Sequence, residues 1–365
     1  MKKILSLLLV VAMVFVSGCG AATESQSLSQ QSAESSNGEA PKEAESDNAA
    51  AYTGGAYELV FASNTGDTAF SNSAYGQAIL KFIEETEKRS NGEIKITLYK
   101  GGALGSTVAE LVGGVQQGSF EFTNWTTANL GEYTDAFMPF NIPFLFSDAS
   151  QIHKLVDSEL GEEMIQQVID DTGMRILVWL DIGFRHMTNS KHPITSPDDV
   201  KGLKIRVQSD IYQIAAIEAL GASATSIAYS ELYAALQQKV VDGQENPLQN
   251  IMDTALYEVQ NYLTLTSHIY GQGVLLMGNT QFESMSEEAR QVLLDSAAVA
   301  QRFCREKSSA VENSLLETLK EKMEVTELSA EELEVFAKTA QTAWDKIAAD
   351  FGQDALDRVV TIVEN

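Results

Sequence analysis

Apolar and polar positions change repeatedly between strand and helix spacing from about residue 57 onward. Residues 57–62 and 94–98 carry alternating or continuous apolar side chains, which predicts strands, and the spacing of apolar residues over 75–83 predicts an amphipathic helix. The same patterns continue along the middle of the chain, with strands predicted at 120–123, 175–180 and 203–207 and helices at 107–117, 149–171, 211–220 and 231–238. Strands that alternate with helices predict parallel sheet of the α/β type.

Two later segments depart from this alternation. The apolar run 137–146 contains Pro139 and Pro143, so it is predicted to be a packed connector and not a strand. From about residue 285 the pattern is helical almost to the end, with one short strand predicted at 323–328.

The first residues form a separate segment. Lys2 and Lys3 precede an apolar run over 4–16, which is shorter than the roughly twenty residues of a membrane-spanning helix and is typical of a secretory signal. Small residues then lead to Cys19, an arrangement that resembles the lipobox of bacterial lipoproteins and implies cleavage after residue 18 and lipidation of Cys19. Residues 19–55 are rich in Ser, Gln, Glu and Ala, which predicts a disordered tether.

Length and charge limit the functions open to the chain. Its 365 residues are enough for two domains. With 25 basic against 51 acidic residues the net charge is −26, which argues against nucleic-acid binding and against docking on anionic lipids. An anionic ligand would therefore have to be captured by a few local cations. Cys19 and Cys304 are the only cysteines in the sequence, and Cys19 is expected to be lipidated, so no disulfide framework is expected. Cys304 is predicted to be a packed residue.

No catalytic constellation stands out. The chain lacks the common nucleophile, P-loop and zinc-protease motifs, and its four histidines show no ligand spacing, so neither a cofactor nor a metal is expected. Arg206 and Arg185 are the candidate binding residues, since each comes near the end of a predicted strand, where ligands of open α/β sheets bind. An arginine there can hold a carboxylate through two parallel hydrogen bonds. The alternative for both is a surface ion pair.

Several segments in order resemble one known family. They are 102–105 (GALG), 143–148 (PFLFSD), 183–190 (GFRHMTNS), 201–207 (KGLKIRV), 229–236 (YSELYAAL) and 241–248 (VDGQENPL). Together they are similar to the solute-binding proteins of tripartite ATP-independent periplasmic (TRAP) transporters, the DctP family. The resemblance covers the chain from Tyr57 onward.

The resemblance implies a fold and a function. The fold is an α/β two-domain clamp of the periplasmic-binding-protein type, with hinge strands and long helices that brace both lobes. The expected division places 56–183 and 272–311 in lobe 1 and 184–271 and 312–365 in lobe 2. The expected function is extracytoplasmic capture of a small organic-acid anion by clamp closure and its delivery to TRAP permease subunits, by a monomer attached to the membrane only through its lipid.

The resemblance also assigns the site. Arg206 is the carboxylate anchor, Arg185 a second cationic contact and Asn246 a hydrogen-bond donor, while Tyr229 forms a cleft wall and Asn64 contributes from the opposite domain. Sialic-acid binders of the family carry acidic residues where this chain has Thr107 and Thr126. Sialic acid is therefore disfavoured, and Trp125 and Thr126 are candidate specificity residues.

The ligand and the partner stay open at this point. A C4-dicarboxylate and a sugar acid both fit one carboxylate anchor. A receptor that presents ligand to a membrane sensor kinase would use the same fold, as would an ATP-driven import receptor. An extracellular enzyme on a bilobal scaffold is a further alternative, against which the lack of a nucleophile or metal constellation counts.

Overall fold

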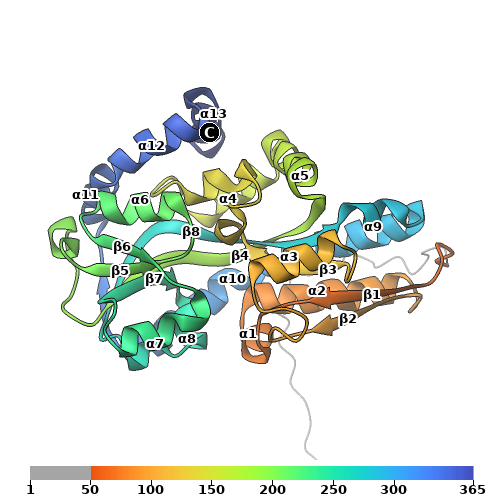
Figure 1. Ribbon diagram of the computed structural model, residues 1–365, viewed down its shortest axis with the longest axis horizontal. Helices are drawn as coiled ribbons and strands as arrows, with labels where there is room; N and C mark the ends of the chain where they lie inside the picture. The colour runs from red at the N-terminus through yellow and green to blue at the C-terminus, as the bar shows by residue number, and fades with distance from the viewer. Residues whose placement is uncertain (1–50, 365) are drawn as a thin grey trace, which may run out of the picture. The chain divides into compact units, whose positions relative to one another are not determined.

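Two long strands, β4 and β8, run through the centre of the fold (Figure 1). The computed structural model describes residues 51–364, so the predicted signal, Cys19 and most of the predicted tether lie outside the described residues. The strands are β1 (Tyr57–Ala62), β2 (Ile94–Tyr99), β3 (Phe122–Thr126), β4 (Met174–Asn189), β5 (Lys204–Val207), β6 (Ser223–Ser226), β7 (Gly243–Pro247), β8 (Tyr262–Gly278) and β9 (Glu324–Glu327).

Helices cover both faces of the sheet (Figure 1). They are α1 (Asp67–Asn72), α2 (Ala74–Arg89), α3 (Val108–Gln116), α4 (Ala149–Val156), α5 (Glu159–Thr172), α6 (Ile211–Ala219), α7 (Leu232–Gln237), α8 (Leu248–Asp253), α9 (Asn279–Ser284), α10 (Glu287–Lys320), α11 (Ala330–Thr339), α12 (Gln341–Phe351) and α13 (Gln353–Glu364). The 3₁₀ turns used below are η1 (Thr127–Leu130), η2 (Asp135–Asn141) and η4 (Tyr229–Glu231).

The strands of the described residues form one nine-stranded sheet of mixed direction, in the order β2-β1-β3-β8-β4-β7-β5-β6, with β9 beside β8. β1 pairs in parallel with β2 and β3, and β5 pairs in parallel with β6 and β7. We call the part built on β1–β3 the first lobe and the part built on β5–β7 the second lobe.

The prediction of parallel sheet is correct within the lobes and wrong at the centre. There β8 returns antiparallel to β3 and β4, and β4 is antiparallel to β7. These pairings are long-range, so no local alternation of helices and strands signals them. The chain crosses between the lobes on strands, which is the two-lobed clamp architecture that the resemblance implied.

β4 passes from the first lobe to the second and is interrupted midway. Its register with β8 shifts between Asp181 and Gly183. Gly183 has a φ of 108°, in the left-handed region that favours glycine, and a Cβ there would stand 3.2 Å from Glu312 Oε1 of α10. Such a shift bends a strand locally and increases its twist. The connection between the lobes is therefore bent where α10 passes it.

α10 is the other element common to both lobes. Its 34 residues begin after the cap at Ser286, whose side chain accepts a hydrogen bond from Ala289 N. At 1.5 Å per residue the helix spans about 51 Å. It packs against α2 in the first lobe, against the central strand β4 and against α8 in the second lobe. Cys304 on this helix is fully buried, as predicted, with its sulfur 3.7 Å from Asp181 O.

The cores of the lobes are separate hydrophobic clusters. Two clusters lie on opposite faces of the first lobe, one centred on Phe140 and Trp179 and the other on Phe82 and Phe122. The second lobe has its own clusters around Ile205 and around β8 and α8. Each lobe therefore buries apolar residues of its own, and a further cluster joins η2 to α6, with Met138 and Ile142 in one cluster with Tyr212.

The chain termini pack more closely than the sequence predicted. The predicted tether runs to residue 55, but Tyr52 is 9% exposed within a first-lobe cluster. Thr53 N and Oγ1 both donate to Glu288 at the start of α10. At the other end, α13 packs on α4, and Val359 and Val363 belong to a first-lobe cluster. The residue boundaries expected for the two lobes stay a prediction.

Most predicted elements form. The capping box of Thr107 and Glu110 starts α3 as expected. The segment 137–146 is a connector that begins in the 3₁₀ turn η2, and 323–328 contains β9. The predicted helix 149–171 is two helices, because Asp157 ends α4 before Ser158 starts α5.

Candidate functional site

Arg206 carries a buried charge without an anionic partner. In β5 the side chains of Ile205 and Val207 face the apolar cluster, which places Arg206 on the opposite face. The residue is 2% exposed, its Nε donates to Ile227 O at 2.8 Å, and its Nη1 has no hydrogen-bond partner in the part of the chain that the structure describes. Burial lowers the pKa of Arg206 to about 10, Arg185 adds to that effect and Glu245 opposes it. The alternative of a surface ion pair does not fit this arginine, since it is buried and forms no ion pair with an acidic side chain of residues 51–364.

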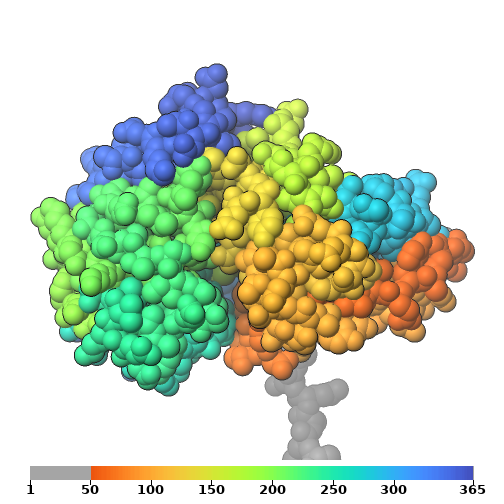
Figure 2. Space-filling model, viewed as in Figure 1, coloured from red at the N-terminus to blue at the C-terminus, as the bar shows by residue number. Residues whose placement is uncertain are grey.

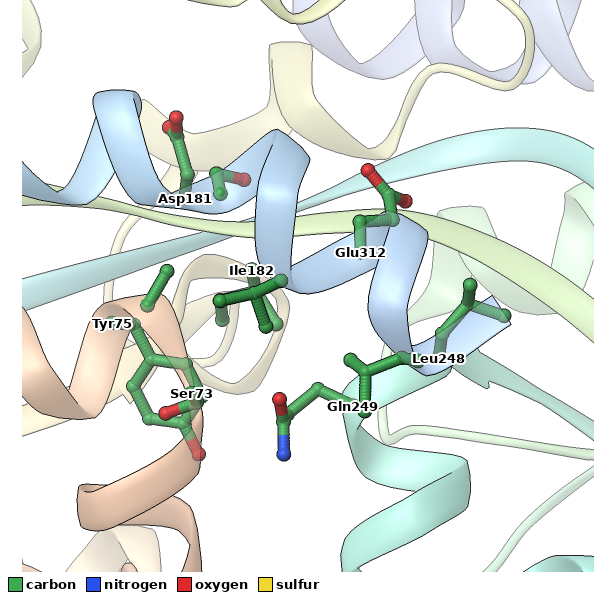
Figure 3. A pocket seen from close by; sticks show the side chains of 11 residues that line it. Ser73, Tyr75, Asp181, Ile182, Leu248, Gln249 and Glu312 are labelled. Atoms are coloured by element: carbon green, nitrogen blue, oxygen red, sulfur yellow. The ribbon is translucent and has the colours of Figure 1, made fainter. Parts of the chain in front are cut away.

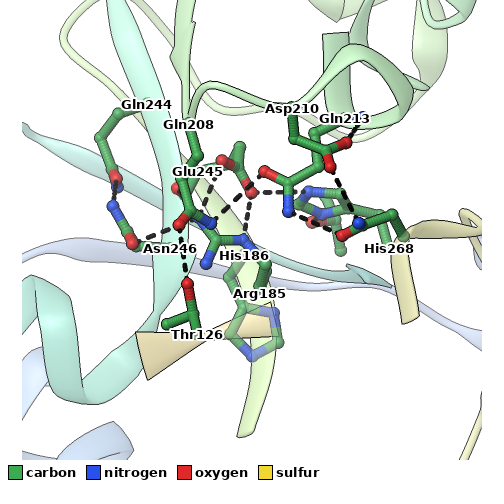
Figure 4. A network of polar contacts seen from close by, with 12 residues as sticks. Thr126, Arg185, His186, Gln208, Asp210, Gln213, Gln244, Glu245, Asn246 and His268 are labelled. Atoms are coloured by element: carbon green, nitrogen blue, oxygen red, sulfur yellow. Dashed lines mark hydrogen bonds and ion pairs between the residues drawn. The ribbon is translucent and has the colours of Figure 1, made fainter. Parts of the chain in front are cut away.

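Arg185, in contrast, is fully paired. It is 2% exposed in β4, next to β7, and its Nε and Nη2 donate to the two carboxylate oxygens of Glu245 at 2.5 and 2.8 Å. Nη2 also reaches Glu245 O at 2.8 Å and Asn246 Oδ1 at 3.2 Å (Figure 4). A bidentate contact of this kind is the strongest form of a charged hydrogen bond. The charge of Arg185 is thus compensated inside the protein.

Glu245 is the acidic residue that sequence reasoning did not assign. It is fully buried, and although burial raises its pKa, Arg185 and His268 lower it more, to about 2. His268 Nε2 lies 3.3 Å from Glu245 Oε2, and its Nδ1 lies 2.7 Å from Thr266 Oγ1. Glu245 lies in the segment 241–248 on which the family resemblance rests, directly before Asn246. That position was the signal from which Glu245 could have been identified as a site residue.

Asn246 and Tyr229 lie close to the arginines. Asn246 is 2% exposed, accepts from Arg185 and donates to Gln244 Oε1, so its amide is held in place by β7 and β4. Tyr229, in η4, is 40% exposed. Burial around its hydroxyl raises the pKa of Tyr229, and the charge of Arg206 opposes the rise. The second lobe therefore brings its four predicted site residues together.

Gln208 connects this cluster to the first lobe. Its amide lies 3.3 Å from Thr126 Oγ1 at the end of β3. With the amide oxygen turned toward Arg185, that oxygen accepts from Nη1 at 2.9 Å and the amide nitrogen donates to Thr126 Oγ1 and Asn129 Oδ1. Thr126 is thus placed opposite Arg185 across the two lobes (Figure 4).

The other two first-lobe residues lie apart from this contact. Asn64 is exposed and lies in the short loop that follows the carboxyl end of β1. Trp125 is 8% exposed and packs in a first-lobe cluster, on the face of β3 opposite to Thr126; its Nε1 has no partner. The roles given to Asn64 and Trp125, like those of the second-lobe residues, stay predictions.

A second polar group adjoins the site. Asp210 caps α6 by accepting from Tyr212 N and Gln213 N, and it also accepts from Asn141 Nδ2 at 2.9 Å. Burial raises the pKa of Asp210 to about 6. The neighbouring His186 stays neutral, since burial lowers its pKa to about 3. η2 and α6 also line an open cavity of about 310 Å³ beside Asp210.

A smaller gap lies beneath the bend of β4. Figure 3 shows Tyr75 of α2 and Gln249 of α8 pointing toward each other below Ile182. The gap measures about 10 Å³, room for about one water molecule.

Within residues 51–364 no cluster of His, Cys, Asp and Glu has the geometry of a metal site. Among the same residues no helix is both long and apolar enough to cross a bilayer.

The geometry defines a class of protein. Two lobes with apolar clusters of their own are joined by central strands, and the second lobe holds a buried arginine that forms no ion pair with an acidic side chain of residues 51–364. This is the arrangement of an α/β solute-binding protein, in which ligands bind outside the carboxyl ends of strands.

The comparisons give the family. Residues 65–350 match the DctP family model, described as bacterial extracellular solute-binding protein family 7, and the chain belongs to this family of TRAP solute-binding proteins. Proteins of this family bind solutes outside the cytoplasm as part of a transport system. They work with a membrane permease.

Named relatives differ in what they bind. The chain is 29% identical over 244 residues to the 2,3-diketo-L-gulonate-binding periplasmic protein of Escherichia coli, covering 67% of this chain and 74% of that one. It is 30% identical over 288 residues to the C4-dicarboxylate-binding periplasmic protein DctP of Rhodobacter capsulatus, covering 78% and 85%. Among solved structures, the sugar acid binding protein of Advenella mimigardefordensis in complex with galactonate has a TM-score of 0.78 and 32% identity, covering 85% and 98%.

Proposed function

We propose that this protein captures a small organic acid with one carboxylate and several hydroxyl groups, and that it passes the acid to a TRAP permease. The observation that carries the proposal is Arg206, a buried guanidinium whose Nη1 has no hydrogen-bond partner among residues 51–364. A buried charge without a partner is costly, and a ligand carboxylate is the group that would compensate it.

The number of free charges favours a monocarboxylate. Of the two arginines in the site, Arg185 is neutralised by Glu245, which leaves one uncompensated cation. A C4-dicarboxylate, as named for the Rhodobacter relative, would bring two negative charges to that one cation. A sugar acid such as the galactonate named for the Advenella structure brings one, and its hydroxyls suit polar neighbours such as Thr126, Asn246 and Asn64.

Capture would proceed by closure of the lobes. Ligand contacts to both lobes are complete only when the lobes are together, so binding shifts the population toward the closed form by no more than that differential affinity. The bend of β4 at Gly183 supports a hinge there, since a few residues of the connecting strands can absorb such a rotation. The acid would be released unchanged, without turnover.

A thermal-shift screen followed by calorimetry tests the proposal. The acids are D-galactonate, D-erythronate, D-glucuronate, succinate and 2-oxoglutarate. A ligand that binds only the native state raises the melting temperature by mass action, by an amount set by its concentration relative to Kd. We expect one of the hydroxylated monocarboxylates to give the largest rise. A larger rise with succinate would overturn the monocarboxylate assignment, and no rise with any acid would overturn the function.

Export and anchoring are proposed from the N-terminal sequence alone. Signal cleavage before Cys19 and lipidation of Cys19 would hold the protein on the outer face of the cytoplasmic membrane, as a monomer. Metabolic labelling with a palmitate analogue should mark the wild-type protein and not Cys19→Ser. Equal labelling of both would exclude Cys19 as the anchor.

A further inference from the structure

The side-chain oxygen of Asn124 is a buried acceptor without a donor. Asn124 is 6% exposed in β3, and its Oδ1 has no hydrogen-bond partner among the described residues. Its Nδ2 donates to Thr65 Oγ1 at 3.3 Å. Buried polar atoms in native proteins almost always have a partner, so this oxygen requires a donor that the chain itself does not supply.

The position of Asn124 is at the carboxyl ends of the first-lobe strands. Successive side chains of a strand alternate between its faces, so Asn124 shares a face with Thr126, which reaches Gln208 in the second lobe. Thr65, its partner, follows Asn64 in the loop after β1. Asn124 therefore lies on the face of β3 that carries Thr126 and is bonded to the loop that carries Asn64, two of the three first-lobe residues expected to contact ligand.

Tyr75 extends the same polar surface toward the second lobe. Burial raises the pKa of the Tyr75 hydroxyl, and Asp253 and Tyr229 of the second lobe add to the rise, while hydrogen bonding from Ser73 and Thr65 opposes it. Thr65 thus links Asn124 to the Tyr75 hydroxyl, which lies within electrostatic range of Tyr229 of the second lobe.

We propose that Asn124 is a specificity-determining residue of this cleft, whose Oδ1 accepts a hydrogen bond from a hydroxyl group of the acid held by Arg206. The assignment rests on the proposed function and deepens it. A hydroxyl can donate to this oxygen, whereas an ionised carboxylate can only accept. A hydroxylated acid therefore satisfies Asn124, and a plain dicarboxylate does not.

Calorimetry with two probes, D-galactonate and succinate, tests the role of Asn124. Asn124→Leu removes the amide but keeps the branching and the number of side-chain heavy atoms, and Asn124→Ala serves if the leucine variant does not fold. Thr123→Val is the matched control, because Thr123 Oγ1 is also buried and unpartnered in β3 but lies on the opposite face. Melting curves without ligand show whether each variant is folded.

The expected result is selective. A site built to bind a hydroxyl discriminates strongly by that contact, so Asn124→Leu should weaken galactonate binding at least about tenfold. Succinate binding, if measurable, should change less than threefold, and Thr123→Val should bind both acids as the wild type does.

Three results would overturn the inference. The first is an unchanged galactonate Kd in Asn124→Leu. The second is a loss of succinate affinity in that variant as large as its loss of galactonate affinity, which would make the amide a donor to carboxylate. The third is a loss of galactonate affinity in Thr123→Val as large as that in Asn124→Leu. Failure of the proposed function is distinguishable, since the wild-type protein would then show no thermal shift with any of the five acids of the screen.

Discussion

Removing the charge of Arg206 is expected to abolish ligand binding without unfolding the protein. The test variants are Arg206→Ala and Arg206→Met, of which the second keeps an apolar stem in the place of the arginine. Two opposing effects set the stability of the free protein, and a third sets the affinity. All three can be derived from the contacts of this one side chain.

The stability of the ligand-free variant depends on a lost hydrogen bond and a relieved charge. The bond from Nε to Ile227 O, at 2.8 Å, is worth about 1.5–3 kcal/mol for a charged donor. Against this, burial lowers the pKa of Arg206 from 12.5 to about 10. At 1.36 kcal/mol per pKa unit this is a folding penalty of about 3 kcal/mol, present at every pH below 10, since the folded state then holds the proton less well. The two effects nearly cancel, so the melting temperature should change little.

Affinity has no such compensation. A ligand carboxylate buried without its cationic partner loses about 3–5 kcal/mol, which corresponds to a Kd weaker by roughly two to almost four orders of magnitude. Arg206→Lys keeps the charge but not the planar fork, and should cost at least about 1.5 kcal/mol of binding free energy.

Calorimetry with the best acid of the screen, together with ligand-free melting curves, measures both quantities. Arg302→Ala, which removes an exposed arginine of α10, is the matched control and should bind as the wild type does. A Kd of Arg206→Met within threefold of wild type would refute the anchor. A fall of several kcal/mol in its ligand-free unfolding free energy would instead show that the guanidinium is a structural cation.

Two further predictions concern the acids around the site. Glu245→Gln leaves Arg185 buried without its counter-ion and should lower the free energy of unfolding by about 3–5 kcal/mol in urea titrations. Because Arg185 holds the pKa of Glu245 at about 2, below the ordinary 4.5, the stability from this pair is present above pH 4.5 and is lost as the pH falls toward 2. Glu245→Gln should therefore remove that part of the acid sensitivity, and an unchanged acid profile would contradict the pairing. Asp210→Asn should instead raise the free energy of unfolding. Burial raises the pKa of Asp210 from 3.8 to about 6, so the ionised form destabilises the fold at pH 7. The variant should gain up to about 3 kcal/mol at pH 7 and nothing below pH 3.8, where the carboxyl is protonated in both states; a gain of equal size at both pH values would count against the titration.

Local patterns were enough for most elements of the lobes. β1, β2 and β5 and the helices α2, α3 and α6 follow from strand alternation, helical spacing and caps, because each has one face against its own cluster. β8 was missed, since the run 262–278 mixes polar residues and glycines with apolar ones and has no clear period. Its 17 residues are a strand because β3 and β4 lie on either side of it.

The sequence by itself determined that this protein has two lobes of α/β type, follows the family pattern and carries arginines at strand ends. Residue type and strand position alone gave Arg206 and Arg185 the same interpretation, and it was the family resemblance that named Arg206 the anchor and Arg185 a second contact. Only the tertiary structure decided that Glu245 compensates Arg185 and leaves Arg206 free, because β7 lies beside β4 in a register that sets Asn246 opposite His186. Only the tertiary structure, likewise, shows that Asn124 Oδ1 has no donor among the described residues, because this depends on which side chains surround it. Residue type and period are local properties, whereas the partner of a buried charge or acceptor depends on contacts between segments far apart in the chain.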